Sequence, residues 1–141
     1  MNEPPLMPVE PLAEDIQYLE DRLYDFNASA TGVTDGRYLA FLLREGGRIV
    51  AGICGNTWGG TCEVRQFWVE EARRGQGVGT LLLQRAEEEA RRRGCTQMVL
   101  MTFSFQAPAF YQRHGFHVVA TIDNHPRGFT NLLMRKTLAP A

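Results

Sequence analysis

The stretch Arg73-Arg74-Gly75-Gln76-Gly77-Val78-Gly79-Thr80 decides how the rest of the chain is interpreted. Three glycines alternate behind two arginines, a strand-like segment (63–69) precedes them, and the apolar run Leu81-Leu82-Leu83 follows. The first N–H groups of a helix lack internal partners, and its dipole favours negative charge there. Glycine lets a ligand approach the backbone, and arginine pairs with phosphate oxygens. The sequence therefore predicts a strand-to-helix turn that binds a diphosphate through Arg74 to Thr80.

Two other phosphate-binding loops fit this stretch less well. A Walker loop needs lysine and then serine or threonine after its last glycine, whereas Gly79 is followed by Thr80 and Leu81. A dinucleotide fingerprint needs glycine at the position of Thr80. A flexible surface turn is the remaining alternative to a phosphate site.

Length and composition indicate one globular domain. The chain has 141 residues with 44% hydrophobic and 22% charged residues, and its net charge is −1. We expect one domain over 1–141, in which the proline-rich 1–11 forms an extended lead-in. The neutral balance does not favour nucleic acid, and no apolar run approaches a membrane span.

The cysteines Cys54, Cys62 and Cys95 are odd in number and match no disulfide or zinc spacing. We therefore expect reduced cysteines, a cytoplasmic protein and no metal site.

Hydrophobic periodicity and turn signals predict an α/β fold. An amphipathic helix over 12–26 is expected to pack on a core. A three-stranded meander should follow, with a turn at 57–60, and then a long helix whose residues Val78, Leu81, Leu82, Ala86 and Ala90 line one side. The expected elements are a helix at 12–26, strands at 38–44, 48–55 and 61–69, a helix at 77–93, a strand at 97–102, a short helix at 108–113, and strands at 116–122 and 129–137.

Two motifs together resemble the GNAT acetyltransferases. Arg74-x-x-Gly77-x-Gly79 is similar to the acyl-CoA loop of that family, and Ala107-x-x-x-Tyr111-x-x-x-Gly115-Phe116 is similar to a second family motif. The order of elements from about residue 38 to 137 agrees with this resemblance. One departure is Ser104, which stands where the family often has asparagine. The segment from Ser104 to Tyr111, with Asp123-x-His125-Pro126-x-Gly128, resembles a bacterial subgroup of the family.

The resemblance implies a mixed, mostly antiparallel sheet with a central splayed parallel strand pair, flanked by helices. It also implies acetyl-CoA as co-substrate. The pantetheine arm would pair with backbone groups of Phe67, Trp68 and Val69, beside a bulge there, and would contact Ser104 and Ala107. One of these N–H groups would polarise the thioester carbonyl.

Tyr111 is the candidate proton donor for the leaving thiolate, because family members often place a tyrosine acid on this helix. The alternative is a core aromatic beside Phe110. Candidate bases for the acceptor amine are Glu63, Asp123 and His125. Glu63 is equally interpreted as a strand carboxylate paired with Arg65 or Arg48, and the loop that carries His125 as a plain hairpin connection.

These features predict an N-acetyltransferase that moves an acetyl group from acetyl-CoA to a primary amine by direct attack in a ternary complex. The acceptor would be a small-molecule amine or a peptide amino group. An acetyl-enzyme at Cys62 is disfavoured because Cys62 lies outside both motifs. The alternatives are a non-catalytic acyl-CoA sensor and, less favoured, a nucleotide phosphate binder. Edge strands of a small sheet also allow a homodimer.

Overall fold

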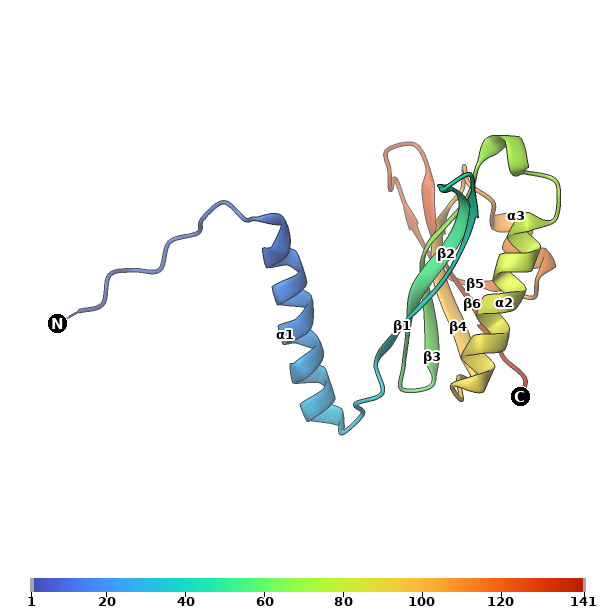
Figure 1. The fold of residues 1–141 in the computed structure, drawn as a ribbon. Helices are drawn as coiled ribbons and strands as arrows, with labels where there is room; N and C mark the ends of the chain where they lie inside the picture. Colours follow the sequence, from blue (N-terminus) through green and yellow to red (C-terminus); the bar gives the residue numbers. More distant parts are fainter. Residues whose placement is uncertain (1, 141) are drawn as a thin grey trace. The chain divides into compact units, whose positions relative to one another are not determined.

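The computed structural model describes residues 2–140, which fall into two compact units, one ending at Thr34 and one beginning at Asp35 (Figure 1). The first unit contains α1 (Ala13–Thr31). At its start the Leu12 N–H donates to Asp15 Oδ2 at 2.7 Å, and at its end Gly32, with φ of 74°, donates to Ala28 O at 2.8 Å. A helix is therefore confirmed here, whereas its packing on a core stays a prediction. The helix runs past Phe26 because no residue before Gly32 supplies a left-handed cap.

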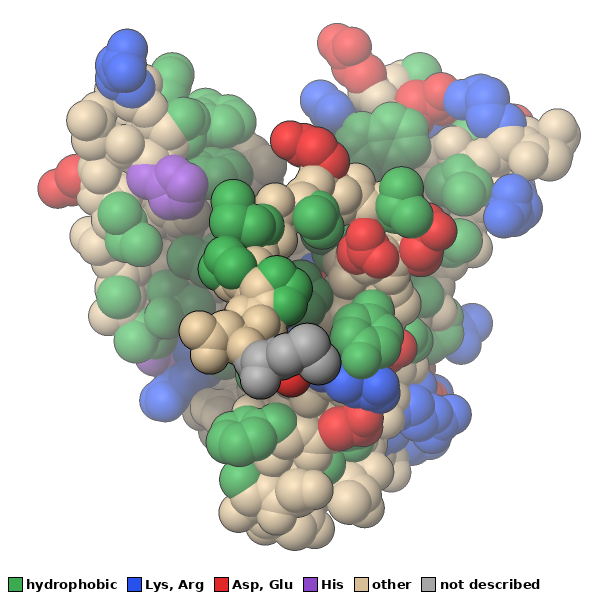
Figure 2. Space-filling model, turned by 90° about the vertical axis from the view of Figure 1, so that its left-hand side faces the viewer, with side chains coloured by type: hydrophobic (Ala, Val, Ile, Leu, Met, Phe, Trp, Pro, Cys, Tyr) green, Lys and Arg blue, Asp and Glu red, His purple; other side chains and the backbone are tan. Residues whose placement is uncertain are grey.

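The two units differ in charge. Residues 1–34 contain seven acidic residues and one arginine, whereas residues 35–141 contain nine acidic and fourteen basic residues. In the space-filling view, hydrophobic side chains lie at the surface among acidic ones (Figure 2). The net charge of the whole chain is near zero because the acidic charge of the N-terminal unit nearly cancels the basic charge of the second unit.

The second unit is a six-stranded mixed sheet with helices. Its sheet order is β1-β2-β3-β4-β6-β5, in which β3 and β4 are parallel and the other neighbours are antiparallel. This confirms the predicted fold class. The elements are β1 (Arg37–Glu45), β2 (Arg48–Trp58), β3 (Thr61–Val69), a 3₁₀ turn η1 (Glu71–Arg73), α2 (Val78–Arg92), β4 (Gln97–Phe103), α3 (Pro108–Arg113), β5 (His117–Asp123) and β6 (Thr130–Thr137).

The core lies between the sheet and α2, which covers one sheet face (Figure 1). Leu81, which was predicted on the buried side of α2, is 47% exposed, and Leu83 is fully buried instead. Glu87 is also buried on this helix, where its carboxylate accepts from Lys136 Nζ at 2.9 and 3.1 Å. The ion pair therefore joins α2 to β6, since a buried carboxylate needs such a partner. The helix buries Leu82, Leu83, Ala86 and Ala90 against strand residues that include Ala51, Ile53, Cys62, Val64, Met98 and Met134.

A β-bulge lies in β3 at Arg65. Cys54 of β2 is opposite Gln66, and the next residue, Gly55, is opposite Val64, so Arg65 is the additional residue. A Cβ atom on Gly55 would lie 1.8 Å from the Glu63 carbonyl oxygen, so the close approach at the bulge requires glycine. The bulge was predicted at Phe67–Val69, and that position was wrong. The predicted turn at 57–60 is also shorter than expected, because β2 continues to Trp58 and only two glycines connect the strands.

The parallel pairing of β3 with β4 covers four residue pairs, from Thr61 opposite Gln97 to Val64 opposite Leu100. β3 continues to Val69 and β4 to Phe103, so the two strands run on without pairing to each other. A gap therefore opens between their C-terminal halves, and the loop before α2 begins where β3 ends.

Candidate active site

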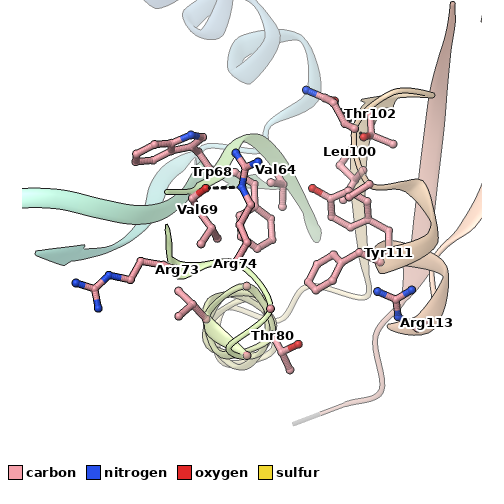
Figure 3. A pocket seen from close by; sticks show the side chains of 18 of the residues that line it. Val64, Trp68, Val69, Arg73, Arg74, Thr80, Leu100, Thr102, Tyr111 and Arg113 are labelled. Atoms are coloured by element: carbon pink, nitrogen blue, oxygen red, sulfur yellow. Dashed lines mark hydrogen bonds between the residues drawn. The ribbon is translucent and has the colours of Figure 1, made fainter. Parts of the chain in front are cut away.

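A cavity of about 830 Å³ lies at this gap. Figure 3 shows Val64, Trp68 and Val69 of β3 on one side and Leu100, Thr102 and Tyr111 on the other. The predicted cofactor-binding residues that line it are Phe67, Trp68, Val69, Arg74, Gly75, Gly77, Val78, Gly79, Thr80 and Ala107. The motifs thus meet at one cavity although about thirty residues separate them in the chain.

The loop before α2 presents backbone N–H groups to the cavity. Gly75 and Gly77 have φ of 74° and 80°, values at which a side chain would be strained. Leu81 N–H donates to Gly77 O at 3.0 Å, so the N–H groups of 78–80 precede the first bond of the helix. A Cβ atom on Gly77 would meet no atom within 4 Å, so the space beside this backbone is open. The arrangement can hold an anion at the positive end of α2.

Side chains fix this loop from two sides. Arg74 Nε donates to Val69 O at 3.0 Å, which ties the loop to β3. Gln76 Nε2 donates to Ala72 O at 3.2 Å, so this predicted binding residue braces the loop and is not among the residues that line the cavity. On the other side, Thr80 Oγ1 lies 3.1 Å from Nε2 of His114, which joins the first turn of α2 to the end of α3.

The backbone of β3 faces the gap at alternate residues. Glu70 N–H donates to Val50 O of β2, so Trp68 directs its backbone groups to β2 as well. Phe67 and Val69 consequently direct theirs toward β4, where the strand pairing has ended. The Val69 carbonyl is already bonded by Arg74, which leaves the N–H groups of Phe67 and Val69 for a ligand lying along β3.

Tyr111 both packs in the core and lines the cavity. Its ring makes edge contacts with Phe67, Phe110 and Phe116, with centroids 6.2, 5.4 and 5.7 Å apart. The residue is 9% exposed, and burial raises the pKa of its phenol to about 12. The phenol is therefore protonated at neutral pH and can donate a hydrogen bond into the cavity.

Cys62 of β3 is fully buried in the core, and burial raises the pKa of its thiol to about 12. Because the thiolate is the nucleophilic form, this side chain is chemically inert at neutral pH.

The candidate bases are not among the residues that line the cavity. Glu63 lies on β3 with its carboxylate 3.7 Å from Arg65 Nε, so the predicted pairing exists, and the side chain is about half exposed. Asp123 Oδ1 accepts from Thr130 Oγ1 at 3.3 Å. The His125 ring makes an edge contact with Phe103 at 5.5 Å between centroids.

Ser104 is held by the neighbouring strand. Its Oγ accepts from Thr130 N–H at 3.1 Å, and its own N–H donates to Thr130 O at 2.8 Å. Gln106 lines the cavity instead, and its Oε1 accepts from Thr102 Oγ1 at 3.1 Å and from Phe103 N–H at 2.9 Å. Gln106 was not predicted from the sequence, although its position next to Ala107 of the second motif was a signal.

Two arginines of the cavity lining were also not predicted from the sequence. Arg65 and Arg113 line the cavity together with Arg73 and Arg74. Arg113 follows Tyr111 by two residues on α3, which was the available signal. Among residues 2–140, no group of three or more His, Cys, Asp or Glu side chains is placed to hold a metal ion. No described helix is long and apolar enough to cross a membrane.

Comparison with known proteins gives the family. The model of the acetyltransferase (GNAT) family matches residues 6–116, which is most of the chain. The chain belongs to the GNAT family. Members of this family are N-acetyltransferases, and the predicted enzyme class is thereby confirmed.

Relatives of this GNAT chain agree with the assignment. It is 37% identical to blasticidin-S acetyltransferase of Streptomyces morookaense over 72% of this chain and 75% of that protein. A crystal structure of a putative acetyltransferase from Agrobacterium tumefaciens is 31% identical, with a TM-score of 0.83 over 98% of this chain and 100% of that one. An aminoglycoside 6'-N-acetyltransferase solved with coenzyme A shares the fold, with a TM-score of 0.66 at 18% identity over 96% and 99% of the two chains.

Proposed function

We propose that this GNAT enzyme transfers the acetyl group of acetyl-CoA to a primary amine by direct attack in a ternary complex. The observation that carries the proposal is the meeting of three features at one cavity: the glycine loop at the start of α2, the unpaired edge of β3, and the phenol of Tyr111. Each feature matches one part of acetyl-CoA.

The diphosphate would lie on the N–H groups at the start of α2, beside Arg74. Gly77 leaves the approach open, and the helix dipole favours the negative charge. The pantetheine arm would then follow β3, with its amides pairing to Phe67 and Val69 as an added strand would. This path directs the thioester toward the end of the β3–β4 pairing, at Val64 and Leu100.

The chemistry at the thioester follows from the groups at that point. A backbone N–H of β3 would stabilise the oxyanion that forms when the amine attacks the carbonyl carbon. As the C–S bond breaks, the Tyr111 phenol would donate its proton to the developing thiolate. The amine would lose its proton to Glu63 or His125 through water, because these groups lie outside the cavity lining. The inert thiol of Cys62 supports direct transfer over an acetyl-enzyme.

For the acceptor, we propose a small amine of the kind found in antibiotics. The support is the name of one relative, an acetyltransferase that acts on blasticidin S. A peptide amino group is the alternative acceptor.

The test is thiol release from acetyl-CoA, measured with a panel of amine antibiotics and a panel of short peptides, with calorimetric titration of CoA alongside. We expect CoA to bind and thiol release to require an amine, with the antibiotic amines the better acceptors. CoA binding without amine-dependent release from any acceptor would favour the sensor, and absence of CoA binding would refute the proposal altogether.

A further inference from the structure

The cavity has a strongly basic lining. Among the described residues that line it, four are arginines and none is acidic. Two of these arginines already face carboxylates: Arg65 lies 3.7 Å from Glu63, and Arg73 pairs with Glu45 and Glu70. Their charges are therefore partly balanced within the protein.

The other two arginines have no carboxylate partner within residues 2–140. Arg74 bonds the Val69 carbonyl through Nε, which leaves the outer edge of its guanidinium for an anion in the loop. The Arg113 guanidinium forms no ion pair or hydrogen bond with a described residue, and its side chain is exposed at the cavity. Two unbalanced cations thus border one cavity, at separate places.

The position of Arg113 is fixed by the contact between α3 and α2. Its neighbour His114 lies 3.1 Å from Thr80, in the first turn of α2. A Cβ atom on Gly79 would lie 3.4 Å from the Phe110 ring, so α3 packs closely against the same turn. Figure 3 shows Arg113 on the side of Tyr111 and Arg73 and Arg74 on the side of β3. Arg113 therefore borders the loop from the side opposite to Arg74.

We propose that Arg113 binds the 3'-phosphate of coenzyme A and makes the enzyme select CoA over 3'-dephospho-CoA. This inference rests on the proposed function. The diphosphate would be bound by the loop N–H groups and Arg74, whereas the 3'-phosphate is a separate, nearly dianionic group one ribose away. A guanidinium matches a phosphate with two parallel N–H donors, which an ammonium does not.

The test compares CoA with 3'-dephospho-CoA by calorimetric titration of the full chain and of two variants. Arg113→Gln removes the proposed contact. Arg85→Gln is the matched control, because Arg85 is an exposed arginine on α2 that does not line the cavity. Thermal melting is expected to be the same for all three proteins, since both arginines are exposed.

We expect the wild type and Arg85→Gln to prefer CoA by about tenfold at low salt, the size of one exposed charge-assisted contact, and less at high salt. Arg113→Gln should lose this preference while its affinity for 3'-dephospho-CoA stays unchanged, and Arg113→Lys should recover part of it. An equal loss of affinity for both ligands in Arg113→Gln would overturn the inference, because Arg113 would then bind the diphosphate that the two ligands share. Unchanged affinity of Arg113→Gln for both ligands would also overturn the inference, because Arg113 would then be a solvated arginine that contacts neither phosphate. Failure of the wild type to bind either ligand would instead refute the proposed function.

Discussion

The role of Tyr111 as proton donor is tested by Tyr111→Phe, which removes one oxygen atom and keeps the ring. The edge contacts with Phe67, Phe110 and Phe116 do not involve the hydroxyl, so the packing should persist. Burial raises the phenol pKa to about 12, about two units above its ordinary value. At ~1.4 kcal/mol per pKa unit, burial disfavours the ionised form by about 3 kcal/mol. The wild-type phenol is therefore protonated, and a hydrogen-bond donor, throughout the neutral pH range.

We expect kcat to fall by ~10²–10⁴-fold in Tyr111→Phe, the usual contribution of a positioned general acid. The dissociation constant of CoA should change less than threefold, which is about 0.6 kcal/mol, because the phenol acts on the sulfur only as charge develops there. Thiol release under saturating acetyl-CoA and amine measures kcat, and calorimetric titration measures CoA affinity. Tyr38→Phe is the matched control, since Tyr38 lies on β1 and is 73% exposed.

Two outcomes would refute this reasoning. An unchanged kcat would leave Tyr111 as a core aromatic that happens to border the cavity. Equal losses in kcat and in CoA affinity, with a lower melting temperature, would show that the hydroxyl supports the structure.

Three further predictions concern the loop, the bulge and alkaline stability. Gly77→Ala should weaken CoA binding at least tenfold, because a methyl group would occupy the open space beside the loop. Gly94→Ala is the control, since Gly94 has nearly the same φ, near 80°, at the other end of α2. Both variants should show the same ~1–2 kcal/mol loss of stability from backbone strain in thermal melting, but Gly94→Ala should bind CoA like the wild type. If both variants bind CoA like the wild type, the loop is not the diphosphate site. Gly55→Ala should lower the free energy of unfolding by more than ~2 kcal/mol in urea titrations, because its Cβ would meet the Glu63 carbonyl at 1.8 Å, and a smaller loss would show that the bulge relaxes easily. The buried Tyr111 has a folded-state pKa above its unfolded value of 10.0, so its contribution to stability is complete below pH 10 and is lost as pH rises toward 12. The wild type should therefore lose more stability than Tyr111→Phe between pH 10 and 12, and parallel losses would contradict the burial of the phenol.

The sequence predicted those features that depend on local pattern. The bounds of β3 and α3 were predicted to the residue, and the helix at 77–93 differs from α2 by one residue at each end. The glycine loop and the second motif were both found because each follows from residues close together in the chain. Their meeting at one cavity followed from the family resemblance.

The errors concern contacts between distant segments. The bulge lies at Arg65 because Gly55, on another strand, admits the Glu63 carbonyl, and nothing in β3 itself signals this. Ser104 bonds Thr130, a partner 26 positions away that only the pairing of β4 with β6 brings near. Arg113 lies at the cavity because α3 packs on the first turn of α2. Hydrophobic periodicity within a six-residue helix does not reveal that packing.

The short pairing between β3 and β4 has a mechanical consequence. Within residues 2–140, four residue pairs and the hydrogen bond from Thr96 N–H to Gly60 O connect the backbone of the β1-β2-β3 half of the sheet to that of the β4-β6-β5 half. This seam has the fewest paired residues of any two neighbouring strands in the sheet, so side chains from α2 and the Glu87–Lys136 ion pair help to hold its two sides together. A molecule that inserts along the same seam would act as an extra strand, so the co-substrate would complete the architecture of the enzyme as well as react in it.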